Sequence, residues 1–83
     1  PSMSVHVSLQ YFASLRDRTG VAHETVATDA RTLAELYAQC ERSHQLGWPI
    51  EKLRVACNGE FAQWSDPLPD GARVAFIPPV SGG

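Results

Sequence analysis

The sequence predicts a small α+β domain in which a mixed sheet of about five strands wraps around one main helix. One segment of about a dozen residues repeats apolar side chains at helical spacing, and shorter segments on both sides of it alternate apolar and polar residues. An Asn-Gly pair, Asn58-Gly59, separates two of these alternating segments and predicts a hairpin. A single long helix with strands before and after it indicates an α+β arrangement.

Length and composition narrow the class of protein. The 83 residues make one domain, and a chain of this size buries only about 60% of its unfolded surface. Seven Lys and Arg stand against nine Asp and Glu, which gives a net charge of −2. This balance lacks the basic footprint of nucleic-acid binding, and no apolar run has the length of a membrane span or the pattern of a signal peptide. We therefore expect a cytoplasmic protein that binds neither nucleic acid nor membrane.

The domain is expected to cover residues 3–77, with an extended C-terminal tail over residues 78–83. Pro1 and Ser2 precede Met3 and are interpreted as a cloning remnant, because a natural chain normally begins at its methionine. The tail is the only segment that resembles a linker, and we find no internal repeat or low-complexity stretch.

Three elements are predicted before the main helix. Residues 5–12 alternate apolar and polar side chains, which is the period of a strand with one buried face. Residues 13–18 are too few for a helix that is stable on its own and predict one helical turn, which Gly20 ends. A second strand over residues 22–28 follows at once, and this close spacing favours antiparallel neighbours.

The main helix is predicted from its cap and its apolar stripe. Thr32 has the side chain of an N-cap and Glu35 stands three residues later, so the two complete a capping box. The helix should end near His44, before Gly47 and the Trp48-Pro49 pair. Apolar residues at helical spacing form its single stripe: Leu33, Leu36, Tyr37 and Cys40.

Three strands are predicted after the helix. Residues 53–58 and 60–64 flank the Asn-Gly turn and form its hairpin. Turn-forming residues fill the stretch 66–71. Residues 72–77 then form the last strand, which leads directly into the tail.

Neither the cysteines nor the histidines form a recognisable site. Cys40 and Cys57 fall on the apolar phase of their elements, so both are interpreted as core residues, and no C-x-x-C motif occurs. His6, His23 and His44 show no metal-ligand spacing, and we expect no metal. The acidic residues lie in loops, caps and solvent-facing positions, so the body supplies no catalytic group. If the chain takes part in chemistry, the reacting group is its own terminus.

The C-terminal tail has a composition that suits presentation to another protein. Pro78 and Pro79 end any sheet ladder, because proline has no N–H to donate, and they hold the following residues extended. Gly82 and Gly83 carry no side chains, so the terminal carboxylate lies on the thinnest backbone a protein makes and can enter a narrow channel. The alternative is a frayed Gly-rich end, which we would favour for a Gly-Gly pair alone.

An apolar patch is expected on the sheet beside the tail. With the strands phased as above, Phe12, Phe61 and Ile77 all point away from the buried face. The buried face is then expected to carry Leu9, Val55 and Phe76. A shift of the phase by one residue would reverse this assignment. A cluster of large apolar groups beside a reactive tail marks a partner site.

Both ends of the chain resemble the small subunits of molybdopterin synthase. Residues 74–83, Val-Ala-Phe-Ile-Pro-Pro-Val-Ser-Gly-Gly, are similar to the end of that family. Residues 11–16, Tyr-Phe-Ala-Ser-Leu-Arg, followed by Gly20, are similar to its first strand and short helix. The resemblance covers essentially all of residues 3–83.

The resemblance implies a ubiquitin-like β-grasp fold and a function for the tail. In this family an E1-like adenylating enzyme uses ATP to activate the terminal carboxylate, here that of Gly83, as an acyl-adenylate. Sulfur then replaces the adenylate and gives a C-terminal thiocarboxylate. The tail inserts into the large synthase subunit and donates its sulfur to cyclic pyranopterin monophosphate, which forms the dithiolene of molybdopterin. The chain itself is expected to hold no permanent cofactor.

The same resemblance implies which residues act. Gly83 carries the reacting carboxylate or thiocarboxylate, and Gly82 is expected to belong to the catalytic tail with it. The active site is expected on the large subunit of a two-plus-two heterotetramer. Arg16 matches an arginine that the family uses in polar contacts, and Ile77 stands where the family often has Phe. The expected partner-binding residues are Phe12, Arg16, Phe61, Ile77, Pro78, Pro79, Val80 and Ser81.

Other functions stay open at this point. A Gly-Gly ending also fits sulfur carriers of thiamine or specialised-metabolite pathways and ubiquitin-like modifiers that are joined to lysines. The Pro-Pro-Val that precedes Ser-Gly-Gly argues against thiamine carriers. A plain ubiquitin-like binding module would use only its apolar sheet face and have an inert terminus. A self-contained enzyme is the least favoured, because the body lacks the residues.

Overall fold

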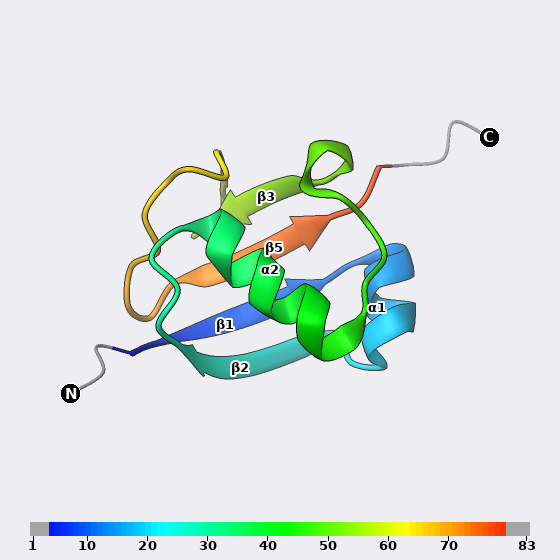
Figure 1. Cartoon of the computed structure of the whole chain (residues 1–83), viewed down its shortest axis with the longest axis horizontal. Helices are drawn as coiled ribbons and strands as arrows, with labels where there is room; N and C mark the ends of the chain where they lie inside the picture. The colour runs from blue at the N-terminus through cyan, green and yellow to red at the C-terminus, as the bar shows by residue number, and fades with distance from the viewer. Residues whose placement is uncertain (1–3, 80–83) are drawn as a thin grey trace.

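A five-stranded mixed sheet organises residues 4–79, the part of the chain that the computed structural model describes (Figure 1). The elements follow in the order β1 (Val5–Tyr11), α1 (Ala13–Thr19), β2 (His23–Thr28), α2 (Leu33–His44), η1 (Ile50–Lys52), β3 (Arg54–Cys57), β4 (Glu60–Ala62) and β5 (Arg73–Ile77). The helix α2 lies across one face of the sheet (Figure 1). The predicted α+β arrangement of about five strands around one main helix is confirmed.

The strand that leads into the tail, β5, is the central strand. The order across the sheet is β2-β1-β5-β3-β4. β5 pairs in parallel with β1 and antiparallel with β3, so that Phe76 lies opposite Tyr11 on one side and Val55 on the other. β1 and β2 are antiparallel neighbours, as their close spacing predicted. The parallel pair of first and last strands is what makes the sheet mixed.

The hairpin of β3 and β4 has the predicted turn but a shorter second strand. Asn58 and Gly59 both have positive φ, 54° and 87°, as a two-residue hairpin turn requires. The prediction that the second strand reaches Trp64 is wrong, because β4 ends at Ala62. The Trp64 carbonyl accepts a hydrogen bond of 3.0 Å from the backbone N–H of Ala34. The chain therefore turns away from the sheet and satisfies a free N–H at the start of α2.

Two short helical elements also differ from prediction. α1 has seven residues rather than a single turn, and it ends where expected, at Gly20 with a left-handed φ of 78°. Its length depends on packing, since Leu15 is completely buried and a helix this short is unstable alone. The three-residue 3-10 helix η1 was not predicted from the sequence.

The cap of α2 is half of the predicted capping box. The Thr32 hydroxyl accepts a hydrogen bond from the Glu35 N–H at 3.2 Å, as expected. The Glu35 carboxylate, however, accepts from the N–H of Arg31 at 2.8 Å rather than from that of Thr32. At the other end, Gln45 closes the helix in a left-handed conformation with φ of 53°. Leu33, Leu36, Tyr37 and Cys40 are all buried, so the predicted stripe is confirmed.

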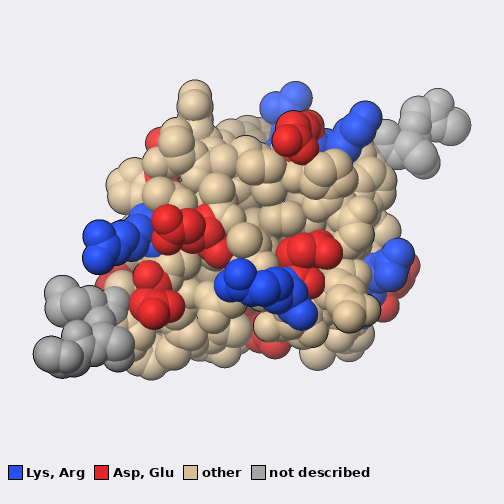
Figure 2. All heavy atoms as spheres, in the orientation of Figure 1, with Lys and Arg blue, Asp and Glu red and all other residues tan. Residues whose placement is uncertain are grey.

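Charged groups of both signs are interspersed on the face that Figure 2 shows. No continuous basic stripe crosses that face, which accords with the net charge of −2. Among residues 4–79, no helix is long and apolar enough to cross a membrane.

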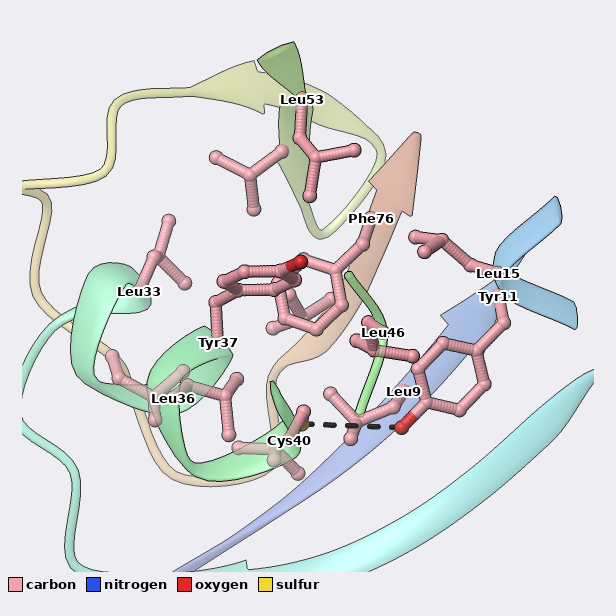
Figure 3. Close-up of a cluster of buried hydrophobic side chains, with 14 of the residues drawn as sticks. Leu9, Tyr11, Leu15, Leu33, Leu36, Tyr37, Cys40, Leu46, Leu53 and Phe76 are labelled. Atoms are coloured by element: carbon pink, nitrogen blue, oxygen red, sulfur yellow. Dashed lines mark hydrogen bonds between the residues drawn. The ribbon is translucent and has the colours of Figure 1, made fainter. Parts of the chain in front are cut away.

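An aromatic cluster forms the centre of the core (Figure 3). The Phe76 ring is completely buried and meets the Tyr37 ring edge-on, with 5.2 Å between centroids. The Phe76 ring also stacks on the Trp64 ring, with 5.9 Å between the ring centroids. Such pairs add roughly 1 kcal/mol each beyond the burial of their area. The cluster ties the central strand to α2 and to the segment that follows β4.

Replacing Thr32 with Ala should lower the free energy of unfolding by about 1 kcal/mol, because the Glu35 N–H loses its side-chain acceptor. Thr32→Ser keeps the acceptor oxygen and should stay within about 0.5 kcal/mol of the parent. Urea denaturation followed by circular dichroism measures both variants. Equal stabilities of the two variants would show that the cap hydrogen bond contributes nothing.

Candidate functional site

The C-terminal tail follows directly from the central strand of the sheet. β5 ends at Ile77, and the two prolines follow directly. Pro78 is buried whereas Pro79 is exposed, so the base of the tail is seated on the body. This end of β5 lies at the end of the molecule that carries α1 (Figure 1). The other predicted tail residues lie outside the described part of the chain: Val80, Ser81, Gly82 and Gly83.

Two predicted partner-binding residues lie on the face of the sheet opposite α2. Phe61 on β4 pairs with Ala56, and Ile77 on β5 pairs with Arg54. Side chains alternate along a strand, so Ile77 points away from the buried face that its neighbour Phe76 occupies. Leu9, Val55 and Phe76 are all buried. The predicted phase of the strands is therefore confirmed.

Phe12 extends the same surface at the end of β1. Its backbone is extended, with φ of −119° and ψ of 150°, so the alternation continues past Tyr11 and turns Phe12 to the open face. The side chain of Phe61 is 72% exposed and that of Phe12 39%, whereas Ile77 is half-buried. We call Phe12, Phe61 and Ile77 the apolar patch. Phe61 is its most exposed member.

Arg16 lies at the same end of the molecule as the tail. It belongs to α1, which packs near the end of β5, and its side chain is exposed. Within residues 4–79 the one close contact between a basic and an acidic side chain joins His44 and Glu24, so Arg16 has no acidic partner there. Its predicted role in polar contacts stays a prediction.

A shallow hollow on the open face was missed at the level of sequence. It has a volume of about 470 Å³ and is lined by residues of β2 and of the three central strands, among them the small side chains of Ser8, Ala56 and Ala75 and the longer ones of Gln10, His23 and Arg73. The sequence feature that could have predicted this hollow is the presence of small residues at outward positions of three strands. Only the pairing of β1, β5 and β3 brings them together.

A polar cluster lies on the covered side, between β1, β2 and α2. The Tyr11 hydroxyl donates a hydrogen bond of 2.8 Å to the Glu24 carboxylate. The same hydroxyl lies 3.9 Å from the Cys40 sulfur (Figure 3). His44 Nε2 is 3.1 Å from the same Glu24 oxygen, and the His44 ring packs edge-on against Tyr11. The cluster links three elements. The sequence assigned His44 no role and gave no sign of this cluster, because its residues are far apart in the chain.

The cysteines are kept as thiols by their surroundings. Burial raises the pKa of Cys40 to about 11, because the thiolate would lose its hydration. Burial also raises the pKa of Cys57, which packs against the core from a half-buried position. The interpretation of Cys40 as a core residue is confirmed, whereas Cys57 is half-buried and packs against the core from outside it. In the described part of the chain, no three His, Cys, Asp or Glu side chains are placed to hold a metal ion.

The architecture defines the class of protein. A mixed five-stranded sheet that wraps one main helix and ends in a central C-terminal strand is the ubiquitin-like β-grasp fold. The model of the ThiS family matches residues 9–83. The chain belongs to this family.

Three known proteins illustrate the relationship. The chain is 36% identical to the molybdopterin synthase sulfur carrier subunit of Escherichia coli, over 93% of this chain and 99% of that protein. It is similar to a chain in the complex of subunits 1 and 2 of molybdopterin-converting factor from Helicobacter pylori, with 25% identity, a TM-score of 0.64 and coverage of 95% and 100%. Small archaeal modifier protein 1 of Haloferax volcanii has a TM-score of 0.79 at 23% identity, with coverage of 92% and 99%, and shows the fold alone.

The raised pKa of Cys40 predicts a loss of stability at alkaline pH. A thiol with a pKa of about 11 in the folded state and 9.0 as its ordinary value favours folding while it is protonated. Its contribution is complete below about pH 9 and is lost as the pH rises toward 11. The stability difference between the parent and Cys40→Ala, measured by urea denaturation, should therefore shrink across this window.

The control for this measurement is Cys57→Ala, which leaves the Cys40 thiol in place. That variant removes only the contribution of Cys57, whose pKa burial also raises, and should keep the part of the alkaline decline that Cys40 causes. A stability difference between the parent and Cys40→Ala that stays constant from pH 9 to 11 would contradict the prediction.

Proposed function

We propose that this chain is the sulfur carrier subunit of a molybdopterin synthase. The observation that carries the proposal is its similarity to the Escherichia coli sulfur carrier, which extends over 93% of the chain at 36% identity. The geometry supports it, because the central strand leads directly into a Pro-Pro-Val-Ser-Gly-Gly ending.

The proposed chemistry takes place at the carboxylate of Gly83. A carboxylate is a poor electrophile until its oxygen belongs to a good leaving group. On an E1-like adenylating enzyme, the carboxylate attacks the α-phosphorus of ATP and pyrophosphate leaves. A sulfur nucleophile then displaces AMP from the acyl-adenylate and leaves a thiocarboxylate. On the large synthase subunit, this sulfur is transferred to cyclic pyranopterin monophosphate, and water restores the carboxylate.

The residues of this chain contribute position rather than catalysis. Pro78 and Pro79 limit the conformations of the tail, which lowers the entropy that is lost each time the tail enters a partner. Five residues follow Pro78. A fully extended chain spans at most about 3.5 Å per residue, so the reacting carbon lies within roughly 18 Å of the body. The catalytic groups of each partner must reach the tail within that distance.

The large synthase subunit is the proposed docking partner. The Helicobacter pylori neighbour was solved as a complex of subunits 1 and 2, which supports a contact of this kind. The apolar patch would pack on that subunit and Arg16 would make polar contacts beside it. The proposal has four further parts: a two-plus-two heterotetramer, a separate contact with the adenylating enzyme, a cytoplasmic location and the lack of a resident cofactor.

Coexpression with the adenylating enzyme and its sulfur source should give a chain whose intact mass shows one oxygen replaced by sulfur. Deletion of Gly83 should prevent the change, because the reacting carboxylate is withdrawn. The chain should also restore molybdenum-cofactor synthesis to an Escherichia coli strain that lacks its own sulfur carrier subunit. A terminus that never gains sulfur would contradict the proposal, and sulfur gain without restoration would indicate a carrier for another pathway.

Phe61→Ser should weaken binding to the large subunit at least tenfold, since a buried aromatic anchor contributes about 2 kcal/mol or more to an interface. The free energy of unfolding should change by less than about 0.5 kcal/mol, because most of the side chain is exposed in the free domain. Titration calorimetry and urea denaturation measure the two quantities. Ala38→Ser, at an exposed position of α2, is the control and should change neither. Unchanged affinity would remove Phe61 from the interface.

A further inference from the structure

A groove runs beside the base of the tail, on the side of η1. Its volume is about 690 Å³, and it is lined by residues of η1, β3, the segment after β4 and the tail base, among them Ile50, Lys52, Arg54, Trp64, Ile77 and Pro78. Of these, only Ile77 and Pro78 belong to the expected partner-binding set. The resemblance and the proposed function leave the other four without a role.

The apolar part of the groove is incompletely covered. Ile50 and Trp64 pack against the core but remain half-buried. Ile77, on the open face, is also half-buried. Large apolar side chains that stay partly exposed in a concave surface are typical of a contact area that a partner removes from water. Because Ile77 also belongs to the apolar patch, the groove is continuous with the proposed docking surface.

Two cations flank this apolar floor. Lys52 ends η1 and Arg54 begins β3, directly opposite Ile77, and both side chains are exposed. Neither forms an ion pair with any residue of the described range 4–79. Among the described residues that line the groove, the one acidic side chain is Glu51, so these side chains carry a net charge of +1 in a chain of net charge −2. This local excess favours an acidic ligand.

We propose that the groove receives an extended segment of the large synthase subunit in which an apolar residue stands next to aspartate or glutamate. The apolar side chain covers Ile50 and Trp64, and the carboxylate pairs with Lys52 and Arg54. The segment then lies alongside the base of the tail and sets the direction in which the tail enters the subunit. This inference rests on the proposed function, since it names a second element of the same docking surface.

Opposite charges at the rim of an interface mainly speed association and orient the partners. We therefore measure association of the full chain with the large subunit of the same organism by stopped flow, at low and high NaCl. Lys52→Glu combined with Arg54→Glu should slow association about tenfold or more at low salt and remove most of its salt dependence. The control, Arg31→Glu combined with Arg42→Glu, makes the same change in net charge at exposed sites at the start and on the surface of α2. It should stay within about threefold of the parent.

The outcomes separate this inference from the proposed function. Equal slowing by the two double variants, in a parent chain that binds the large subunit, would overturn the groove as a docking site and leave the sulfur carrier function standing. A parent chain that does not bind the large subunit would overturn the proposed docking function and the groove with it.

A photocrosslinking residue identifies the occupant. Glu51 is exposed and lines the groove, so Glu51→p-benzoylphenylalanine places the reactive group there. Illumination of the complex should link it to a peptide of the large subunit that has an apolar residue beside aspartate or glutamate. Crosslinks to residues 80–83 of the same chain would overturn the proposal, because the tail itself would then occupy the groove.

Discussion

The burial of Phe76 in the central strand is the constraint on which the rest of the structure depends. Its ring meets Tyr37 from α2 and Trp64 from the segment after β4, and it is completely enclosed. Because side chains alternate along a strand, the next residue, Ile77, must face the open side of the sheet. Pro78 then ends the hydrogen-bond ladder. One buried ring thus accounts for the outward direction of Ile77, next to the point where the tail begins.

The two faces of the sheet differ: one covers the core, and the other carries the apolar patch that the proposed function assigns to partner binding. The covered face holds the core and the cluster of Tyr11, Glu24 and His44, which joins three elements through hydrogen bonds. Its thiol, Cys40, is held protonated by burial and takes no part in sulfur chemistry in the proposed function. The open face carries Phe61 and a hollow lined by small residues. In the proposed function, the domain holds the reacting group at the end of its C-terminal tail.

Most elements could be predicted because their signals are local. The Thr32 cap, the apolar stripe of α2 and the Asn58-Gly59 turn each act over a few residues, and each is found where expected. The errors arose where distant contacts override local pattern. β4 ends before Trp64 because the Trp64 carbonyl bonds to the start of α2 and its ring stacks on Phe76. α1 is longer than predicted because its packing buries Leu15. The groove and the polar cluster combine residues from separate segments of the chain, so no local sequence pattern could predict them.

By itself, the sequence determined the chemistry available to the tail, because proline acts through its fixed φ and missing N–H and glycine through its missing side chain. These properties need no partner residue. Only the tertiary structure decided that β5 lies between β1 and β3 and that two cations flank the tail base. Those arrangements depend on the pairing of strands far apart in the chain, and apolar burial alone does not specify which strands pair.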